Sequence, residues 1–201
     1  MIYAVGDLDA ASTRIAESLG LSSVAGGRHP GWGTENRIVP LGAEYLELVT
    51  VADPVAAAAS DFGRAVMNAT SRGDQLVGWA VATDDVAAVA TRLNLDVTSG
   101  TRTRPDGTTL SWRLAGVARA LRSGALPFFI EWDAPAERHP GRATADHRTH
   151  PRGIDWVEIA SEAEAITAWL GESDLPVRMT TGAPALCAVG IGVTGGEAVL
   201  R

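Results

Sequence analysis

The residues best suited to chemistry lie in a glycine-dense stretch near the N-terminus and in a short apolar segment that follows it. Positions 26–37 place His29, Trp32 and Asn36 among four glycines, and positions 45–48 carry Glu47 as their one charged side chain. An imidazole, an indole, an amide and a carboxylate can together hold a small molecule by stacking and hydrogen bonding. The sequence therefore predicts a loop at 26–37 that wraps a ligand, with Glu47 beside it.

Glu47 has two alternative roles. A carboxylate in an otherwise apolar strand is costly to bury without a partner. It either faces a ligand, because buried carboxylates cluster at functional sites, or it pairs with Arg37 or Arg113 as a buried ion pair that performs no chemistry.

Arg113 and Glu131 are further candidates, on later predicted strands. A buried arginine needs an anionic partner, which here is either Glu131 or a carboxylate or phosphate group of a substrate. The predicted pocket residues are therefore His29, Trp32, Asn36, Glu47, Arg113 and Glu131.

A repeated pattern indicates how these residues are positioned. Residues 4–15 align without gaps with residues 82–93, at an offset of 78 residues. In each copy a short apolar strand ends at an aspartate, Asp7 or Asp85, suited to cap a helix whose apolar positions share one face. Three strand-like segments then follow, which makes each copy a βαβββ unit. The predicted organisation is a first unit at 1–52, a connecting helix at 53–74, a second unit at 75–132, a polar linker or flap at 133–152, and a third βαβββ-like unit at 153–201.

Several short motifs resemble one known family. The block at 26–36, the Tyr-Leu-Glu-Leu run at 45–48, the turn at 104–107 and the run at 126–132 occur in the order seen in the glyoxalase-like branch of the vicinal oxygen chelate superfamily. The resemblance implies an α+β fold in which tandem βαβββ units form curved mixed sheets that enclose a cavity.

The resemblance also implies a divalent metal, held by a histidine on the first strand and a glutamate on the last strand of each of two units. Glu47 and Glu131 match the two glutamates, but Gly78 stands where the second histidine would be, and the first would precede Met1. Two carboxylates alone are a poor transition-metal site. We therefore expect no cofactor, with Glu47 and Glu131 as weak metal candidates; a divalent metal stays open if a loop histidine, His29 or His139, supplies the imidazole.

Composition narrows the function further. The chain of 201 residues has a net charge of −7 and no lysine, which argues against nucleic-acid binding and removes lysine-based covalent catalysis. No apolar run is long enough to span a membrane, and a cytoplasmic location is expected. The favoured function is binding of a small anionic or vicinal-oxygen ligand, with catalysis left open. The alternatives are a metal-dependent lyase, isomerase or dioxygenase, and a purely structural module. Residues 153–201 are expected either to form a homodimer or to pack on the outside of the barrel that the first two units form.

Overall fold

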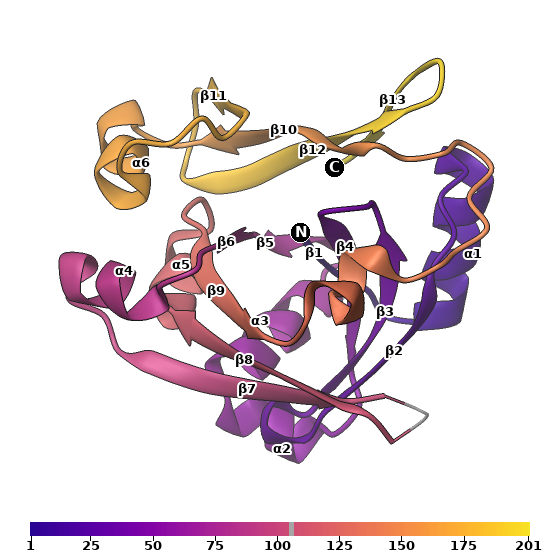
Figure 1. Cartoon of the computed structure of the whole chain (residues 1–201), viewed down its shortest axis with the longest axis horizontal. Helices are drawn as coiled ribbons and strands as arrows, with labels where there is room; N and C mark the ends of the chain where they lie inside the picture. The colour runs from indigo at the N-terminus through magenta and orange to yellow at the C-terminus, as the bar shows by residue number, and fades with distance from the viewer. Residues whose placement is uncertain (105–106) are drawn as a thin grey trace.

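The computed structural model describes residues 1–104 and 107–201, and its largest element is a curved nine-stranded sheet built from two βαβββ units (Figure 1). The first unit comprises β1 (Ile2–Ala4), α1 (Leu8–Leu19), β2 (Val24–His29), β3 (Thr34–Pro40) and β4 (Tyr45–Val51). The second comprises β6 (Ala80–Ala82), α4 (Val86–Leu93), β7 (Val97–Thr103), β8 (Thr109–Ala115), α5 (Val117–Ser123) and β9 (Phe128–Asp133). Between them lie α2 (Pro54–Ala59), α3 (Asp61–Thr70) and β5 (Gln75–Gly78).

The two units form the two halves of one sheet, and the strands of the second unit follow in the reverse of the order found in the first. The order is β5-β1-β4-β3-β2-β7-β8-β9-β6, and the halves meet where Arg28 of β2 pairs with Thr103 of β7. Strands β5 and β6 stand at opposite ends of this order, yet only Trp79 separates them in the chain. The sheet must therefore curve until its two ends approach each other, which confirms the predicted α+β fold with a curved mixed sheet.

The helix starts follow from local sequence as predicted. The Asp7 side chain accepts hydrogen bonds from the backbone of Asp9 and Ala10 at the start of α1, and Asp85 accepts one from Ala88 at the start of α4. Each cap satisfies backbone donors that the first turn of a helix leaves free.

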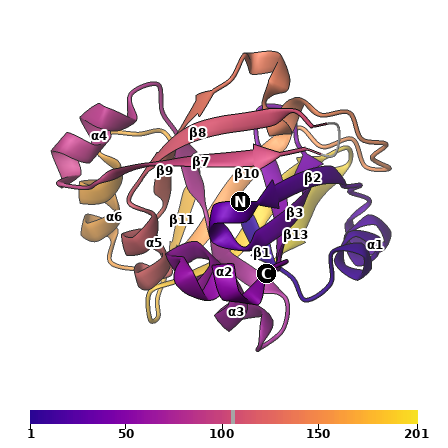
Figure 2. The same ribbon diagram turned by 90° about the horizontal axis from the view of Figure 1, so that it is seen from below.

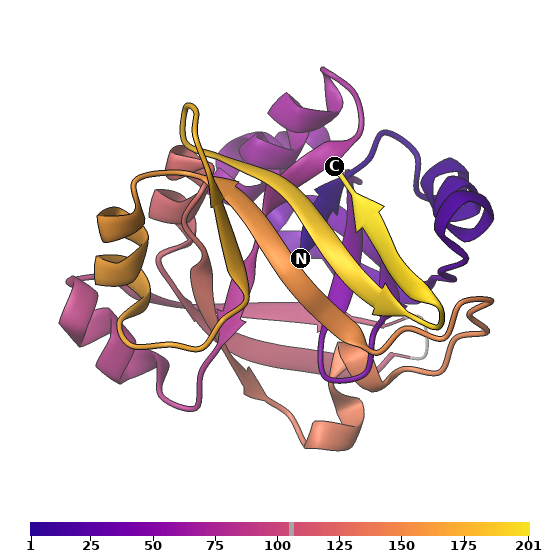
Figure 3. The ribbon, with the colours of Figure 1, turned by 90° about the horizontal axis from the view of Figure 1, so that it is seen from above.

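The C-terminal part forms a second sheet, which covers the outside of the first unit (Figures 1 and 3). Its elements are β10 (Gly153–Ala160), α6 (Ala163–Leu170), β11 (Val177–Thr180), β12 (Ala185–Val193) and β13 (Gly196–Leu200). The strand order is β11-β10-β12-β13. Strand β10 pairs in parallel with β11, the first strand after α6, whereas β1 pairs in parallel with β4, the last strand of the first unit. Ile191 and Val189 of β12 join Leu46 and Leu48 of β4 in one buried cluster. The C-terminal part also contacts the second unit, because Trp169 of α6 shares a buried cluster with Phe129 of β9. Packing on the outside of the two units is thus the arrangement found within one chain.

Helices α2, α3 and α5 lie together on another side of the molecule, as seen from below (Figure 2). Phe62 and Val66 of α3 and Ala120 of α5 share a buried cluster with Trp112 and Phe128, which belong to β8 and β9. These helices therefore fill part of the concave side of the curved sheet and bound the space left inside it.

The structure differs from the sequence-based expectation in several places. Residues 26–29 belong to β2 instead of a loop, and the expected single connecting helix is two helices, because Ser60 is extended and caps α3. Helix α5 was not predicted. The predicted turn at 104–107 includes Pro105 and Asp106, which lie outside the described residues. None of the helices described is both long and apolar enough to cross a membrane.

Candidate ligand-binding site

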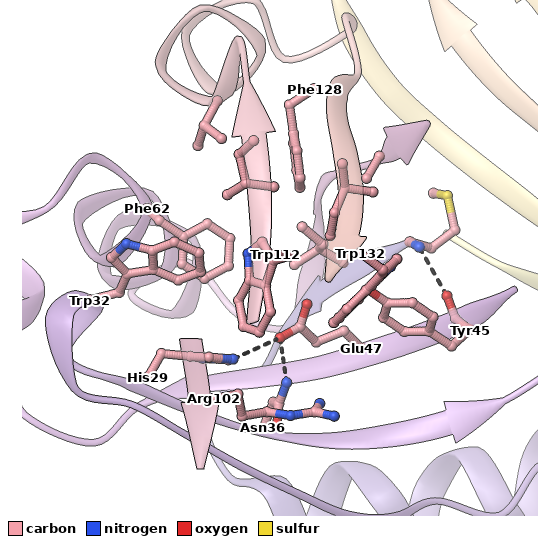
Figure 4. Close-up of a pocket in the computed structure, with 16 residues that line it drawn as sticks. His29, Trp32, Asn36, Tyr45, Glu47, Phe62, Arg102, Trp112, Phe128 and Trp132 are labelled. Carbon is pink, nitrogen blue, oxygen red and sulfur yellow. Dashed lines mark hydrogen bonds and ion pairs between the residues drawn. The ribbon is translucent and has the colours of Figure 1, made fainter. Parts of the chain in front are cut away.

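A small cavity lies between the two units, with walls from both (Figure 4). Its free volume is about 40 Å³, room for a few water molecules. The first unit and α3 contribute Met1, Ile2, His29, Trp32, Asn36, Tyr45, Glu47 and Phe62. The second unit contributes Ala80, Arg102, Trp112, Leu114, Val117, Phe128, Ile130 and Trp132.

One wall of the cavity is polar and is organised around Glu47, which is 9% exposed. The Nδ2 atom of Asn36 donates a hydrogen bond of 2.5 Å to Glu47 Oε1, and His29 Nε2 lies 3.9 Å from the same oxygen. Figure 4 shows both contacts converging on that oxygen, while the other carboxylate oxygen points toward the cavity interior. A carboxylate held on one side in this way keeps an acceptor free for a ligand.

The positions of Asn36 and His29 depend on the β2–β3 hairpin. Asn36 Oδ1 accepts a hydrogen bond of 2.9 Å from the Gly27 backbone, and His29 Nδ1 shares one of 3.0 Å with Thr34 Oγ1. A Cβ atom at Gly26 would stand only 2.0 Å from Asn36 Oδ1. The glycine-rich sequence predicted as a ligand-wrapping loop therefore serves close packing between two strands. The Asn36 Nδ2 group remains available to bind Glu47.

The opposite wall is aromatic. The ring centroids of Trp112 and Trp132 are 5.1 Å apart, and those of Trp32 and Phe62 are also 5.1 Å apart. The His29 ring lies 5.4 Å from Trp32 and 5.9 Å from Trp112, so it joins the polar wall to the aromatic one. Contacts of this kind hold flat apolar groups well.

The sequence-predicted residues divide into two groups. His29, Trp32, Asn36 and Glu47 all line the cavity. Arg113 and Glu131 do not: they form an ion pair with each other, and Glu131 also accepts a hydrogen bond from the Val86 backbone at the start of α4.

Strand alternation explains why Arg113 and Glu131 lie outside. Successive side chains of a strand point to opposite faces. Because Trp112 and Leu114 of β8 face the cavity, Arg113 between them must face outward, and Glu131 follows the same rule between Ile130 and Trp132. The hydrogen bonds from Val86 and Arg113 hold the pKa of the Glu131 carboxyl below its ordinary value.

Arg102 is the charged side chain among the described cavity residues that sequence reasoning missed. It belongs to β7, and only 3% of its surface is exposed. Its segment is rich in threonine, serine and glycine, and an arginine there resembles a solvent-facing residue. The available signal was alternation along β7, which places Arg102 on the same face as Gly100. Gly100 pairs with Trp112 of the neighbouring strand β8, and Trp112 faces the cavity.

The histidines of the linker 133–152 are spread apart. His139 packs against Tyr45 and Trp132, with ring centroids 5.5 Å from each, and so borders the cavity without lining it. His147 accepts a hydrogen bond from the Ser22 backbone, and His150 is exposed. His139 therefore contributes to closing one end of the cavity.

The donor set does not fit the metal site that the family resemblance implies. The inward positions of the paired first and last strands are Ile2 and Glu47 in the first unit and Ala80 and Phe128 in the second. Phe128, and not Glu131, thus occupies the place equivalent to Glu47. Within residues 1–104 and 107–201, no group of three or more His, Cys, Asp or Glu side chains could hold a metal ion.

Burial controls the electrostatics of the polar wall. Burial lowers the pKa of His29 below its ordinary value of 6.5; the Glu47 charge opposes this effect and the Arg102 charge adds to it. Burial likewise raises the pKa of Tyr45. Burial also lowers the pKa of the Met1 amino group, which borders the cavity, to about 6. Among the described residues, Arg102 is therefore the lining group that keeps its positive charge at neutral pH, while His29 is neutral.

The lowered pKa of His29 predicts a pH dependence of stability. The unfolded chain takes up a proton at this histidine below about pH 6.5, while the folded chain does so only at lower pH. The stabilisation is complete above pH 6.5 and is lost as pH falls toward the folded-state pKa. Urea unfolding at pH 7.5 and 5.5 should show a smaller pH difference for His29→Asn than for the unchanged protein.

His139 and His147 also have lowered pKa values, so the informative quantity is the difference between variants. The control is His150→Asn at an exposed site, where asparagine tolerates the positive φ of 44°. Equal pH slopes in His29→Asn and the unchanged protein would contradict the assignment.

Comparison with known proteins places this geometry in a family. A glyoxalase-like domain model matches residues 1–173, which is most of the chain. The chain belongs to the glyoxalase-like domain family. The tandem βαβββ arrangement of the structure agrees with this assignment. A comparison with curated protein sequences found no match.

Three solved structures resemble this glyoxalase-like protein to different extents. A hypothetical protein from Staphylococcus aureus superposes with a TM-score of 0.70 at 15% identity, over 100% of this chain and 96% of its own. Methylmalonyl-CoA epimerase from Mycobacterium tuberculosis gives a TM-score of 0.46 at 19% identity, over 67% of this chain and 85% of its own. A Streptomyces coelicolor epimerase variant in complex with 2-nitronate-propionyl-CoA gives 0.47 at 16% identity, over 66% and 94%. The Staphylococcus aureus protein therefore shares the fold along the whole chain, C-terminal sheet included.

Proposed function

We propose that this glyoxalase-like protein binds a small anionic or oxygen-rich organic molecule in the cavity between its two units, without the metal typical of the superfamily. The observation that carries the proposal is the polar wall, in which Asn36, His29 and Glu47 are buried together against a space lined by aromatic rings. Apolar cavities with a few convergent polar groups are the usual form of a small-molecule site.

The polar wall defines what a ligand would offer. Glu47 presents a free oxygen that accepts a hydrogen bond from a ligand hydroxyl or N–H group, and His29 supplies a ring nitrogen beside it. Because the free space is only about 40 Å³, anything larger than a few atoms must displace side chains as it binds.

The same pair of residues permits proton transfer. A neutral imidazole and a carboxylate, with Nε2 and Oε1 3.9 Å apart, can take a proton from a bound ligand and return it elsewhere. Binding alone and metal-independent acid–base catalysis therefore share one site. The metal-dependent alternative has less support, since three of the four inward strand positions are apolar.

The test uses two glutamates that differ in the face of the sheet they occupy. A panel of small organic acids, diols, dicarbonyl compounds and neutral aromatics would be screened by thermal shift, together with Mn²⁺ and Zn²⁺ after chelator treatment. Compounds that stabilise the unchanged protein should also stabilise Glu131→Gln, because Glu131 lies outside the cavity. Those that carry a hydroxyl or N–H group should lose their effect on Glu47→Gln.

Two results would contradict the proposal. The first is that every stabilising compound with a hydroxyl or N–H group acts equally on Glu47→Gln and on the unchanged protein. The second is stoichiometric Mn²⁺ or Zn²⁺ binding that disappears in Glu47→Gln, which would favour the metal-dependent alternative.

A further inference from the structure

Arg102 is a buried cation whose guanidinium has no partner in the described part of the chain. Arg102 as a whole is 3% exposed. Its Nε atom is fully buried and has no hydrogen-bond partner among residues 1–104 and 107–201. A buried charged group normally makes several hydrogen bonds, since the loss of water around it is otherwise costly. The unmet donor therefore requires an explanation at this position.

Glu47 does not provide that partner. Within the described residues no ion pair of 4.0 Å or less joins Arg102 to a carboxylate. Glu47 is instead bound by Asn36, and its charge acts on Arg102 only through space. The charge of the guanidinium is thus partly balanced, while its N–H groups remain available.

The fold makes room for the Arg102 side chain. Arg102 belongs to β7 of the second unit and lines the cavity together with Asn36 and Glu47 of the first unit (Figure 4). A Cβ atom at Gly27 of β2 would lie 2.8 Å from Arg102 Cγ and 2.3 Å from the Thr103 carbonyl oxygen. The bare backbone at Gly27 therefore lets the arginine stem cross β2 at the junction of the two units.

The charges of the cavity limit the ligand to a single negative charge. Among the described lining residues Arg102 is the lasting cation, because burial lowers the pKa of His29 and lowers that of the Met1 amino group to about 6. This one cation can balance a monoanion in a space of low polarity, whereas a dianionic phosphate would keep an unbalanced negative charge. The guanidinium has the fork geometry that suits a planar carboxylate, and the Trp112 and Trp132 rings provide a surface for a flat apolar body.

We propose that Arg102 is the anion anchor of the cavity, and that its ligand is a monocarboxylate with a small, flat apolar or aromatic body. This inference rests on the proposed function and names the ligand class of the same site. The carboxylate would accept hydrogen bonds from the guanidinium, including its unmet Nε donor, and the flat body would lie against the tryptophan wall.

The test measures benzoate binding by isothermal titration calorimetry to the unchanged protein and to three variants. Benzamide, which is nearly the same shape but uncharged, and inorganic phosphate serve as comparison probes. Arg102→Met removes the anchor, Arg102→Lys keeps the charge without the fork, and Arg113→Met is the matched control at an outward-facing arginine. Circular dichroism verifies that each variant is folded.

Benzoate should bind the unchanged protein and Arg113→Met with equal affinity, and should bind Arg102→Met roughly 10- to 100-fold more weakly. Arg102→Lys should fall between them, and benzamide should bind weakly to all four proteins. If Arg102→Met and the unchanged protein bind benzoate with equal affinity, Arg102 is not the anchor. If phosphate binds more tightly than benzoate, the ligand is not a monocarboxylate.

The outcomes separate the anchor from the proposed function. Neutral compounds that bind in a Glu47-dependent manner, with no carboxylate depending on Arg102, would retain the cavity as a binding site and reject the anchor. Absence of binding by benzoate and by every compound of the wider panel would reject both.

Discussion

Replacing Arg102 with methionine is expected to raise the free energy of unfolding by about 1–3 kcal/mol, the cost of burying a hydrogen-bond donor without a partner. The reason is the buried guanidinium without a partner, together with the apolar cavity residues around it. Methionine fills an irregular space well and carries no group that needs hydrogen bonds. Urea unfolding followed by circular dichroism measures the change.

Arg113→Met is the control for this stability experiment. Arg113 is exposed and pairs with Glu131 on the outer face, so its replacement should bring no gain. If Arg102→Met proves less stable than the unchanged protein, the guanidinium has a stabilising partner in solution, and the unmet-donor argument fails.

A gain in stability together with a loss of binding would identify Arg102 as a residue kept for function. Proteins commonly give up stability at binding sites, because the unsatisfied groups that a ligand needs are unfavourable in its absence. Saturating benzoate should therefore raise the stability of the unchanged protein and leave that of Arg102→Met almost unaltered.

Replacing Ile191 with aspartate is expected to lower the free energy of unfolding by more than about 4 kcal/mol, which is exceptional for a single substitution. Ile191 of β12 is fully buried, and it lies in the cluster that joins the C-terminal sheet to Leu46 and Leu48 of the first unit. An ionised carboxylate there would have no partner and no water. Thermal and urea unfolding measure the effect.

The matched control is Val55→Asp, because the Val55 side chain is 82% exposed at the start of α2. Its stability should stay close to that of the unchanged protein. Because Leu46 and Leu48 flank Glu47 on the opposite face of β4, Ile191→Asp should also weaken ligand binding. A melting temperature for Ile191→Asp within 2 °C of the control would show that the C-terminal sheet contributes little to the fold.

Local patterns in the sequence predicted much of the fold because they reflect interactions between near neighbours. The aspartate caps at Asp7 and Asp85 and the helical spacing after them depend only on residues within a few positions. The repeat at an offset of 78 residues then paired the two units, and the motifs near 26–36 and 45–48 indicated the family. By contrast, the break at Ser60 and the hairpin at 26–36 depend on contacts with other elements.

The candidate site was predicted only in its first-unit half. His29, Asn36 and Glu47 lie within 18 positions of one another on adjacent strands, so a cluster could be inferred from proximity in the chain. Arg113 and Glu131 were placed in the cavity because their charge looked unusual among apolar neighbours. They lie outside the cavity. Alternation along a strand divides its residues between two faces, but it shows which face is inward only after one inward residue is known.

The sequence by itself determined the starts of α1 and α4, the tandem βαβββ organisation, the family, and the polar residues of the first unit that line the cavity. Only the tertiary structure decided that Arg102 crosses β2 at Gly27, that Phe128 takes the place equivalent to Glu47, and that β12 covers the outside of β4. The physical reason is distance along the chain. Helix caps and strand patterns depend on interactions within a few residues, whereas these three features depend on segments that are dozens of positions apart. Such contacts depend on how the sheet curves and on which strands meet, and neither is encoded in any one segment.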